Sequence, residues 1–341
     1  MNVLVTGGTG LVGGAVARAL LARGHSVRLY ARASSDAAAL EAAGAEVARG
    51  ELDDRAALRA ALAGRDAVVH SAGVVGFGPG LEAALEAVNV RAVESVLGAA
   101  LDAGVSRAVL TSSTAVMGGT AAPEVADEAS AGNAEALGMP YFVSKLRGER
   151  AARALAARGL ALVVVRPAYV LGPGDVHGSS ASILLAFARR RIPAYVEGGA
   201  SFCDVRDVAE GHVAALERGR PGEAYVLAGH NLAMSEMIRR ACAIAGVPPP
   251  PRVPVPLALG FAAVQELAAR AAGRRPRTSR GLVRASALYT FASSAKAERE
   301  LGYRVRPFEE MVRDTYRWAI ATGRLRPDTP ELKALNENDR P

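Results

Sequence analysis

The chain has 341 residues, of which half are hydrophobic and 22% are charged. These values are typical of a globular enzyme built as one large α/β domain, or as a main domain with a smaller second one. The net charge is +7, but the basic residues are spread along the chain without interleaved aromatic residues, so we expect no nucleic-acid partner.

The first predicted element leads directly into a glycine-rich turn. Residues 3–5 form an apolar strand, glycines follow at positions 7, 10 and 13, and an apolar helix covers residues 15–22. This arrangement places a pyrophosphate group at the N-terminus of a helix. Gly7 allows the tight turn, Gly10 lets the backbone approach the phosphate, and Gly13 lets the helix pack on the strand. The turn therefore predicts a dinucleotide site, formed by Gly7, Thr9, Gly10, Leu11, Val12 and Gly13.

The second predicted strand, residues 27–30, is followed by Arg32. An Asp or Glu at the end of this strand would bind the ribose 2′-hydroxyl of NAD, but no acidic residue stands there. A guanidinium group suits a 2′-phosphate instead. We therefore expect NADP(H) as the cofactor, in preference to NAD(H).

Strand and helix patterns continue to alternate through the first half of the chain. Further strands are predicted at residues 67–70, 108–110 and 162–165, with helices at 56–63, 90–103 and 140–158. Alternation with continuously apolar strands predicts a doubly wound parallel sheet, a Rossmann fold whose ligands bind at the carboxyl ends of the strands. We expect a dinucleotide-binding core at residues 1–165, a smaller substrate-binding region at 166–326 interleaved with the last core elements, and a loosely attached tail at 327–341.

A tyrosine and a lysine share one face of the helix predicted at 140–158. Tyr141 and Lys145 are four residues apart, and a nearby ammonium group lowers the pKa of a tyrosine towards neutrality. Tyr141 is therefore a candidate general acid/base. Ser113 follows the strand at 108–110, at the sheet edge where a hydroxyl can bind a substrate carbonyl.

The later part of the chain contains an apolar helix at residues 255–272. Gln265, Glu266 and Arg270 interrupt it, so we expect no integral membrane span, whereas attachment to a membrane surface stays open. Cys203 and Cys242 have no Cys or His neighbour at metal-ligand spacing, so we expect no metal site. The few cysteines and the absence of a leader before the first strand predict a reduced, cytoplasmic protein.

The glycine pattern, Ser113 and the Tyr141-x-x-x-Lys145 pair together resemble the extended branch of the short-chain dehydrogenase/reductases, within the NAD-dependent epimerase/dehydratase superfamily. The resemblance extends from residue 2 to about residue 325. The chain most resembles dihydroflavonol-reductase-like and 3β-hydroxysteroid-dehydrogenase-like proteins, including hopanoid-associated proteins labelled as sugar epimerases. Further matches lie at residues 50–53, 70–73, 88–90, 166–167, 204–209 and 293–303.

The resemblance implies roles for individual residues. Tyr141 would exchange a proton with the substrate oxygen, Lys145 would bind the nicotinamide ribose and lower the Tyr141 pKa, and Ser113 would be the catalytic hydroxyl. Ser112 would support Ser113. The resemblance also implies a homodimer formed through the helices at 90–103 and 141–155, and further cofactor contacts from Glu51, Leu52, Ala72, Gly73, Tyr141, Lys145 and Pro167.

The expected substrate is an apolar alcohol or ketone, such as a sterol or terpenoid. Many nucleotide-sugar enzymes of the superfamily have an arginine where this chain has Ala200, and alanine cannot bind phosphate through its side chain. The loop at 74–79 is apolar, and Phe77, Ser113 and Tyr169 are the expected substrate contacts. A sugar epimerase or dehydratase is the alternative. A non-catalytic NADP(H)-binding regulator is disfavoured, because all three candidate catalytic residues are present.

Overall fold

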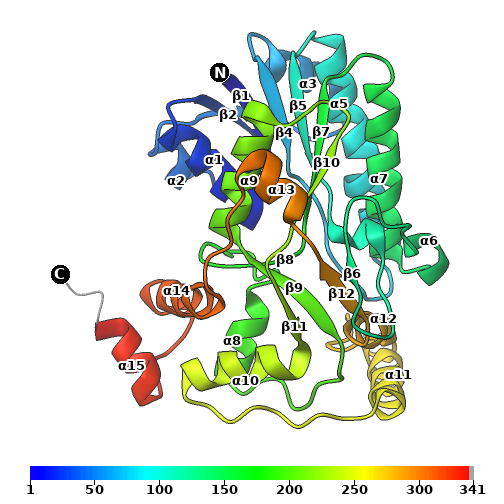
Figure 1. The fold of residues 1–341 in the computed structure, drawn as a ribbon, viewed down its shortest axis with the longest axis vertical. Coiled ribbons are helices and arrows are strands. Elements are labelled where there is room, and N and C mark those ends of the chain that lie inside the picture. Colours follow the sequence, from blue (N-terminus) through cyan, green and yellow to red (C-terminus); the bar gives the residue numbers. More distant parts are fainter. Residues whose placement is uncertain (338–341) are drawn as a thin grey trace.

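The computed structural model describes residues 1–337. The centre of the fold is a parallel sheet of seven strands. Figure 1 shows these strands between the helices. The sheet confirms the predicted doubly wound α/β fold, and all five strands expected from the sequence belong to it. In spatial order its strands are β10 (Ala224–Leu227), β7 (Leu162–Pro167), β5 (Arg107–Thr111), β4 (Ala67–His70), β1 (Asn2–Thr6), β2 (Ser26–Ala31) and β3 (Glu46–Arg49).

Helices cover both faces of this sheet because alternate strand residues point to opposite sides. Val3 and Val5 pack in a core with α1 (Leu11–Ala22), α2 (Ala38–Glu41) and α9 (Val205–Arg218). Leu4, between them, packs in a second core on the other face. The helices on that face are α3 (Arg55–Leu62), α5 (Ala92–Asp102) and α7 (Pro140–Ala156).

A second, smaller sheet lies below the first in Figure 1. Its strands are β11 (His230–Ala233), β9 (Gly199–Asp204), β12 (Tyr289–Ala292) and β6 (Val125–Ala126), and β8 (Tyr169–Leu171) pairs with β9. Phe202, Phe308 and Tyr316 have fully buried side chains that lie in its core. The surrounding helices are α8 (Ser182–Ala188), α10 (Met234–Ala245), α14 (Phe308–Ala321) and α15 (Pro330–Glu337).

The last helix corrects the expectation of a loosely attached tail. Leu332 and Leu335 of α15 are buried in the core of the second sheet. Thr329 begins the helix, donating a hydrogen bond to the Ala245 carbonyl at 2.7 Å and accepting one from the Leu332 amide. Two leucines three residues apart are enough to attach this otherwise polar segment. The remainder of the expected tail, residues 338–341, lies outside the described residues.

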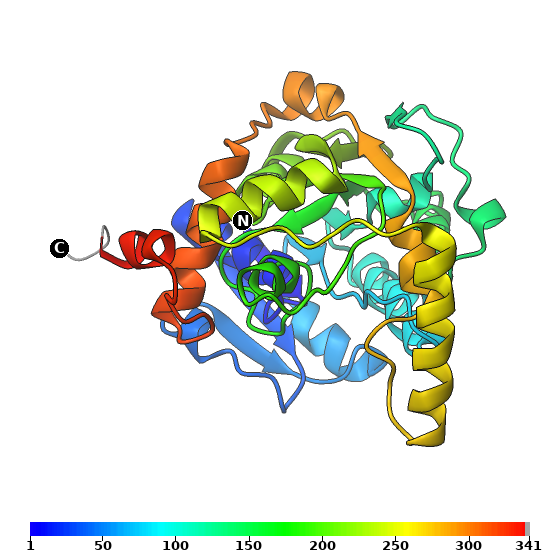
Figure 2. The same cartoon turned by 90° about the horizontal axis from the view of Figure 1, so that it is seen from below.

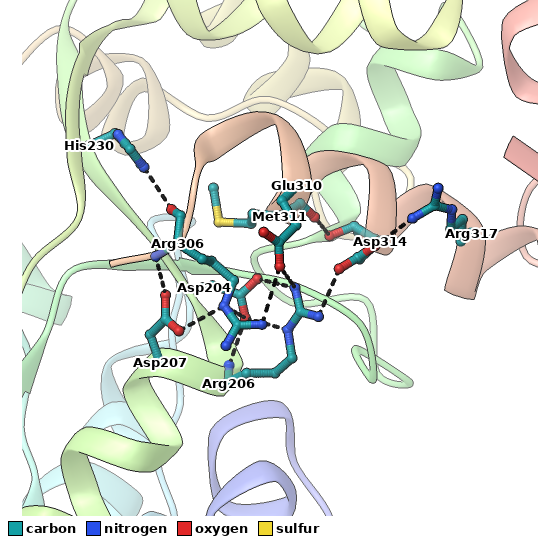
Figure 3. A network of polar contacts seen from close by, with 10 residues as sticks. Asp204, Arg206, Asp207, His230, Arg306, Glu310, Met311, Asp314 and Arg317 are labelled. Atoms are coloured by element: carbon teal, nitrogen blue, oxygen red, sulfur yellow. Dashed lines mark hydrogen bonds and ion pairs between the residues drawn. The ribbon is translucent and has the colours of Figure 1, made fainter. Parts of the chain in front are cut away.

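Ion pairs connect the start of α9 to the C-terminal helices (Figure 3). Arg206 bonds Asp204 and Asp314, both at 2.7 Å, and Arg306 bonds Asp207 at 2.7 Å. The His230 ring bonds the Arg306 carbonyl at 2.9 Å. The segment at 204–209, which matched the family pattern in the sequence, therefore joins the two parts of the fold.

The remaining elements are helices and helical turns outside the two sheets. Within residues 1–337, no helix has the length and apolar character needed to cross a lipid bilayer. Both cysteines are free and buried. The elements are α4 (Glu82–Glu86), a π-helical turn η1 (Ala87–Arg91), a 3₁₀ turn η2 (Thr114–Met117), α6 (Ala134–Leu137), α11 (Val255–Ala271), α12 (Arg280–Ser286) and α13 (Ala295–Leu301).

Two fully buried histidines make the folded protein sensitive to acid. Burial lowers the pKa of His70 to about 3, with a contribution from the charge of Lys145, and lowers the pKa of His212 to about 4. His212 Nδ1 lies 2.7 Å from the Val208 carbonyl, so this nitrogen carries the proton and Nε2 accepts from the Thr111 hydroxyl at 3.0 Å.

Stability is therefore expected to fall as the pH drops below the unfolded histidine value of about 6.5. Both folded pKa values lie below that value, so the unfolded chain binds these protons first. The change from pH 7 to pH 5 should cost about 2 kcal/mol for each histidine. Urea titrations at the two pH values would measure it, and His212→Gln should reduce the difference. An unchanged difference in this variant would contradict the assignment.

Candidate functional site

A cavity of about 410 Å³ opens at the carboxyl ends of β1, β2 and β4. Eight of the residues predicted to bind the cofactor line it: Gly7, Thr9, Gly10, Arg32, Glu51, Leu52, Ala72 and Gly73. The other predicted contacts do not line it. Leu11, Val12 and Gly13 form the first turn of α1, and Pro167 ends β7.

The glycine turn has the geometry that the sequence predicted. Gly7 has φ of +73°, and a Cβ atom there would lie 2.5 Å from the Ala72 amide nitrogen. A Cβ atom at Gly13 would lie 2.3 Å from the Gly7 carbonyl oxygen, so only glycine lets α1 pack this closely. Gly10 precedes α1 without a side-chain cap, and the first turn has no acidic residue. The N–H groups of this turn can therefore bind an anion.

A basic turn follows β2 at the far end of the cavity. Arg32 and Ser35 both line the cavity, and the Ser35 amide donates to the Arg32 carbonyl at 3.0 Å. Arg49 fixes this turn, because its guanidinium donates to the carbonyls of Arg32 and Ser35 at 3.0 and 2.7 Å. No carboxylate occupies the position directly after β2, although Glu51 and Asp53 line the cavity nearby.

The structure brings together the three candidate catalytic residues. Tyr141 and Lys145 lie on α7, and Ser113 directly precedes η2 at the end of β5. The Ser113 hydroxyl shares a hydrogen bond with the phenol of Tyr141 and accepts one from the Ala115 amide at 3.1 Å. Lys145 Nζ donates to the Thr111 carbonyl at 3.0 Å.

Burial controls the protonation of this group. It raises the pKa of Tyr141, and the hydrogen bond with Ser113 opposes that shift. It also lowers the pKa of Lys145 to about 8, while the negative charge of Glu149 opposes it. The expected lowering of the Tyr141 pKa by Lys145 is therefore not present in this structure. The lysine instead bonds a backbone carbonyl, and desolvation of the phenol is the largest cause of its raised pKa.

Asn89 positions the segment between the cavity and α7. It lies in the π-helical turn η1, and its amide makes two hydrogen bonds of 2.9 Å with the backbone of Val74 and one of 3.0 Å with the Ser144 hydroxyl. A Cβ atom at Gly73 would lie 3.5 Å from Asn89 and 3.4 Å from Lys145 Nζ. The sequence match at residues 88–90 marked this asparagine but gave no reason for it.

A buried ion cluster lies behind the catalytic strand. Glu149 is 3% exposed, and its carboxylate accepts hydrogen bonds from Ser112 at 2.8 Å, Arg153 at 3.0 Å and Arg166 at 2.6 Å. Burial raises the pKa of Glu149, but the bonds and charges of these partners outweigh it and lower the pKa. Ser112 therefore connects α7 to the end of β5, and its expected support of Ser113 stays a prediction.

Two phenylalanine rings pack against the ring of Tyr141. The ring of Phe77 lies edge to face with Tyr141 at a centroid distance of 5.5 Å. It lies edge to face with Phe142 at 6.2 Å. Tyr169, the other expected substrate contact, packs against Phe202 at 5.3 Å within the core of the second sheet. It does not belong to the aromatic group formed by Phe77, Tyr141 and Phe142.

Comparison with known proteins identifies the family. The model of the NAD dependent epimerase/dehydratase family matches residues 3–228. The chain belongs to this family. It is an NAD(P)-dependent oxidoreductase with a Rossmann fold, as the resemblance to the extended short-chain dehydrogenase/reductase branch implies.

The proteins similar to this chain include some named as reductases and others named as epimerases. A dihydroflavonol 4-reductase-like protein of Synechocystis sp. is 34% identical over 92% of this chain and 93% of its own length. The sterol demethylase protein B of Methylococcus capsulatus is 34% identical, with coverages of 89% and 93%. The crystal structure of gox2253 is 37% identical with a TM-score of 0.84, covering 95% of this chain and 99% of its own. A nucleoside-diphosphate-sugar epimerase from Pseudomonas aeruginosa is 27% identical with a TM-score of 0.80, and coverages of 96% and 99%.

Two residues that line the cavity of this epimerase/dehydratase-family protein were not predicted from the sequence. His177 lines the cavity and bonds the Thr9 carbonyl at 3.1 Å, and Arg91 lines it from η1. Both come from segments far from the glycine turn in the sequence. Only the 88–90 match, next to Arg91, was a signal. His177 lies in a loop without a motif, so nothing in the sequence connected it to Thr9.

Proposed function

We propose that the protein interconverts a secondary alcohol and a ketone, or reduces an aldehyde, using NADP(H), and that its substrate is apolar and sterol- or terpenoid-like. The observation that supports this most directly is the pair of phenylalanine rings beside the phenol of Tyr141. An apolar wall beside the ring of the catalytic tyrosine favours a hydrophobic substrate, since it would leave the hydroxyls of a sugar without hydrogen-bond partners.

In this proposal, Tyr141 exchanges the proton with the substrate oxygen and Ser113 holds that oxygen by a hydrogen bond. Lys145 binds the nicotinamide ribose. The residues fit the dinucleotide, because Gly7 and Gly10 of the glycine turn line the cavity at the uncapped end of α1. Gly73 also lines it, and a Cβ atom there would lie 3.4 Å from Lys145 Nζ. When bound, the nicotinamide nucleotide supplies or accepts the hydride.

Ala200 supports a reductase over a nucleotide-sugar epimerase. It lies in β9, is 7% exposed, and pairs with Leu232 and Thr290 in the neighbouring strands. No cation is therefore available at this position to bind a sugar diphosphate. A homodimer through η1, α5 and α7 stays a prediction.

Turnover with a panel of apolar ketones and aldehydes tests the proposed reaction. We expect NADPH oxidation, followed at 340 nm, with at least one of them and no epimerisation of UDP-glucose. The named epimerase among the relatives makes this second assay necessary. Epimerisation of the activated sugar without turnover of any carbonyl compound would contradict the proposal.

Arg32→Asp tests the preference for NADP(H). The substitution places a carboxylate where the 2′-phosphate is proposed to bind, so the Kd for NADPH should rise about 10- to 100-fold, which is the loss of one charged hydrogen bond or more. The Kd for NADH should change little. Fluorescence titration of both nucleotides would measure this, with Arg59→Asp, an exposed site on α3, as the matched control. Equal weakening of both nucleotides would remove the assignment.

A further inference from the structure

Helix α11 exposes a row of large apolar side chains. Leu257 is 64% exposed, Phe261 54%, Val264 65% and Leu267 71%. The only buried residues of this 17-residue helix are the small residues Ala262 and Ala269. Globular proteins do not normally leave four large apolar side chains together in water, so this face indicates an interaction surface.

The exposed side chains lie on one face of the helix. At about 100° per residue, they fall within an arc of about 120°, which also contains Gly260, Ala268 and Ala271. Glu266, the one acidic residue of α11, lies opposite and bonds Arg280 of α12 at 2.8 Å. Figure 2 shows α11 at the periphery of the molecule, with one side of the helix facing away from the body.

Cations gather where α11 ends. Arg270, Arg274, Arg275 and Arg277 are all exposed, and within residues 1–337 none of the four has an ion pair. None of them lines the cofactor cavity, so they do not close over the dinucleotide. The surface thus combines an apolar face with a neighbouring cluster of unneutralised positive charge.

We propose that the apolar face of α11 docks into the surface of a lipid bilayer containing anionic phospholipids, with the arginine cluster on the headgroups. An amphipathic helix of about 25 Å that lies in the interface plane inserts its apolar side chains and leaves basic groups at headgroup level. A second copy of the chain fits less well, because the exposed face of α11 offers no carboxylate to the partner's arginines.

The docking surface is connected to the catalytic group. After the arginine cluster, the Ser279 hydroxyl donates to the Phe77 carbonyl at 2.8 Å and also caps α12. Phe77 in turn contacts Tyr141. A protein attached through α11 would therefore hold its apolar substrate wall close to the bilayer, where a lipid-soluble substrate is concentrated. This consequence, unlike the docking itself, rests on the proposed function.

Co-sedimentation with vesicles tests the docking. We expect the full-length protein to bind phosphatidylcholine vesicles that contain phosphatidylglycerol, and to bind pure phosphatidylcholine much more weakly. The double variant Phe261→Glu/Leu267→Glu should lower the partition coefficient at least about tenfold, since two inserted side chains are replaced by charges. The matched control is Val125→Glu on β6, where valine is 60% exposed, and it should bind like the wild type.

A charge-reversal pair tests the arginine cluster separately. Arg274→Glu/Arg275→Glu should weaken binding about tenfold or more, because each basic residue near the surface contributes about 1 kcal/mol. Arg55→Glu/Arg59→Glu on α3 makes the same change of net charge elsewhere and should have little effect. Circular dichroism would establish that each variant is folded.

Two outcomes would overturn the proposal. One is vesicle binding that neither double variant reduces. The other is a concentration-dependent dimer, seen by analytical ultracentrifugation, that Phe261→Glu/Leu267→Glu abolishes, because the face would then belong to a second copy. Vesicle binding is measured without substrate or cofactor, so its failure is distinguishable from a failure of the proposed reaction.

Discussion

Tyr141→Phe is expected to lower kcat by about 10²- to 10⁴-fold while leaving the Kd for NADPH nearly unchanged. The substitution removes the phenolic hydroxyl, which is the group proposed to exchange a proton with the substrate. It keeps the ring, whose contacts with Phe77 and Phe142 hold the aromatic group together. The loss should therefore affect the chemical step and not the fold.

Single-turnover kinetics with an apolar ketone, together with fluorescence titration of NADPH, would separate the two effects. Tyr316→Phe is the matched control. Tyr316 is also a fully buried tyrosine, and burial raises its pKa, but it lies on α14 in the core of the second sheet. We expect only a small change in this control. A rate near that of the wild type in Tyr141→Phe would exclude the proposed proton transfer.

The sequence predicts five of the seven strands of the large sheet, because each of these five carries its own signal, whereas β3 and β10 were not predicted. Buried parallel strands are continuously apolar, and the glycine turn and the helices between them mark their ends. Strands β8 and β9 were not predicted from the sequence. They belong to a sheet whose partners come from distant parts of the chain, so tertiary contacts and not local pattern define them. The contacts that hold α15 also come from distant parts of the chain, so the sequence alone predicts a loosely attached tail there.

The candidate site shows a similar division. The glycine turn, Ser113 and the Tyr141–Lys145 pair are local motifs, and the sequence identified them. The protonation of the pair could not be predicted in this way, because it depends on burial and on which acceptor Lys145 reaches. Glu149 was missed for a related reason: its partners come from β5, α7 and β7, and only the fold brings them together.

Glu149→Gln is expected to destabilise the protein by about 3 kcal/mol, because removing one member of a buried ion pair leaves an uncompensated buried charge. Arg166, only 13% exposed, would then have no carboxylate partner among residues 1–337. The amide of glutamine can still accept from Ser112, so the effect would isolate the charge. Glu135→Gln is the control, since its pair with Arg150 lies at the surface, and the midpoint of urea denaturation should not change.

The same variant should also move the pH dependence of activity. The negative charge of Glu149 raises the pKa of Lys145 against the larger effect of burial, which leaves that pKa at about 8. Without the charge, the lysine becomes neutral at a lower pH. Deprotonation of Lys145 is expected to produce an alkaline limb in the pH profile of kcat/KM, and in the variant this limb should shift towards acid, at a pH where the variant is still folded. A purely structural role for Glu149 would lower stability and leave this limb in place, so the two measurements together decide whether the buried cluster acts on the catalytic lysine.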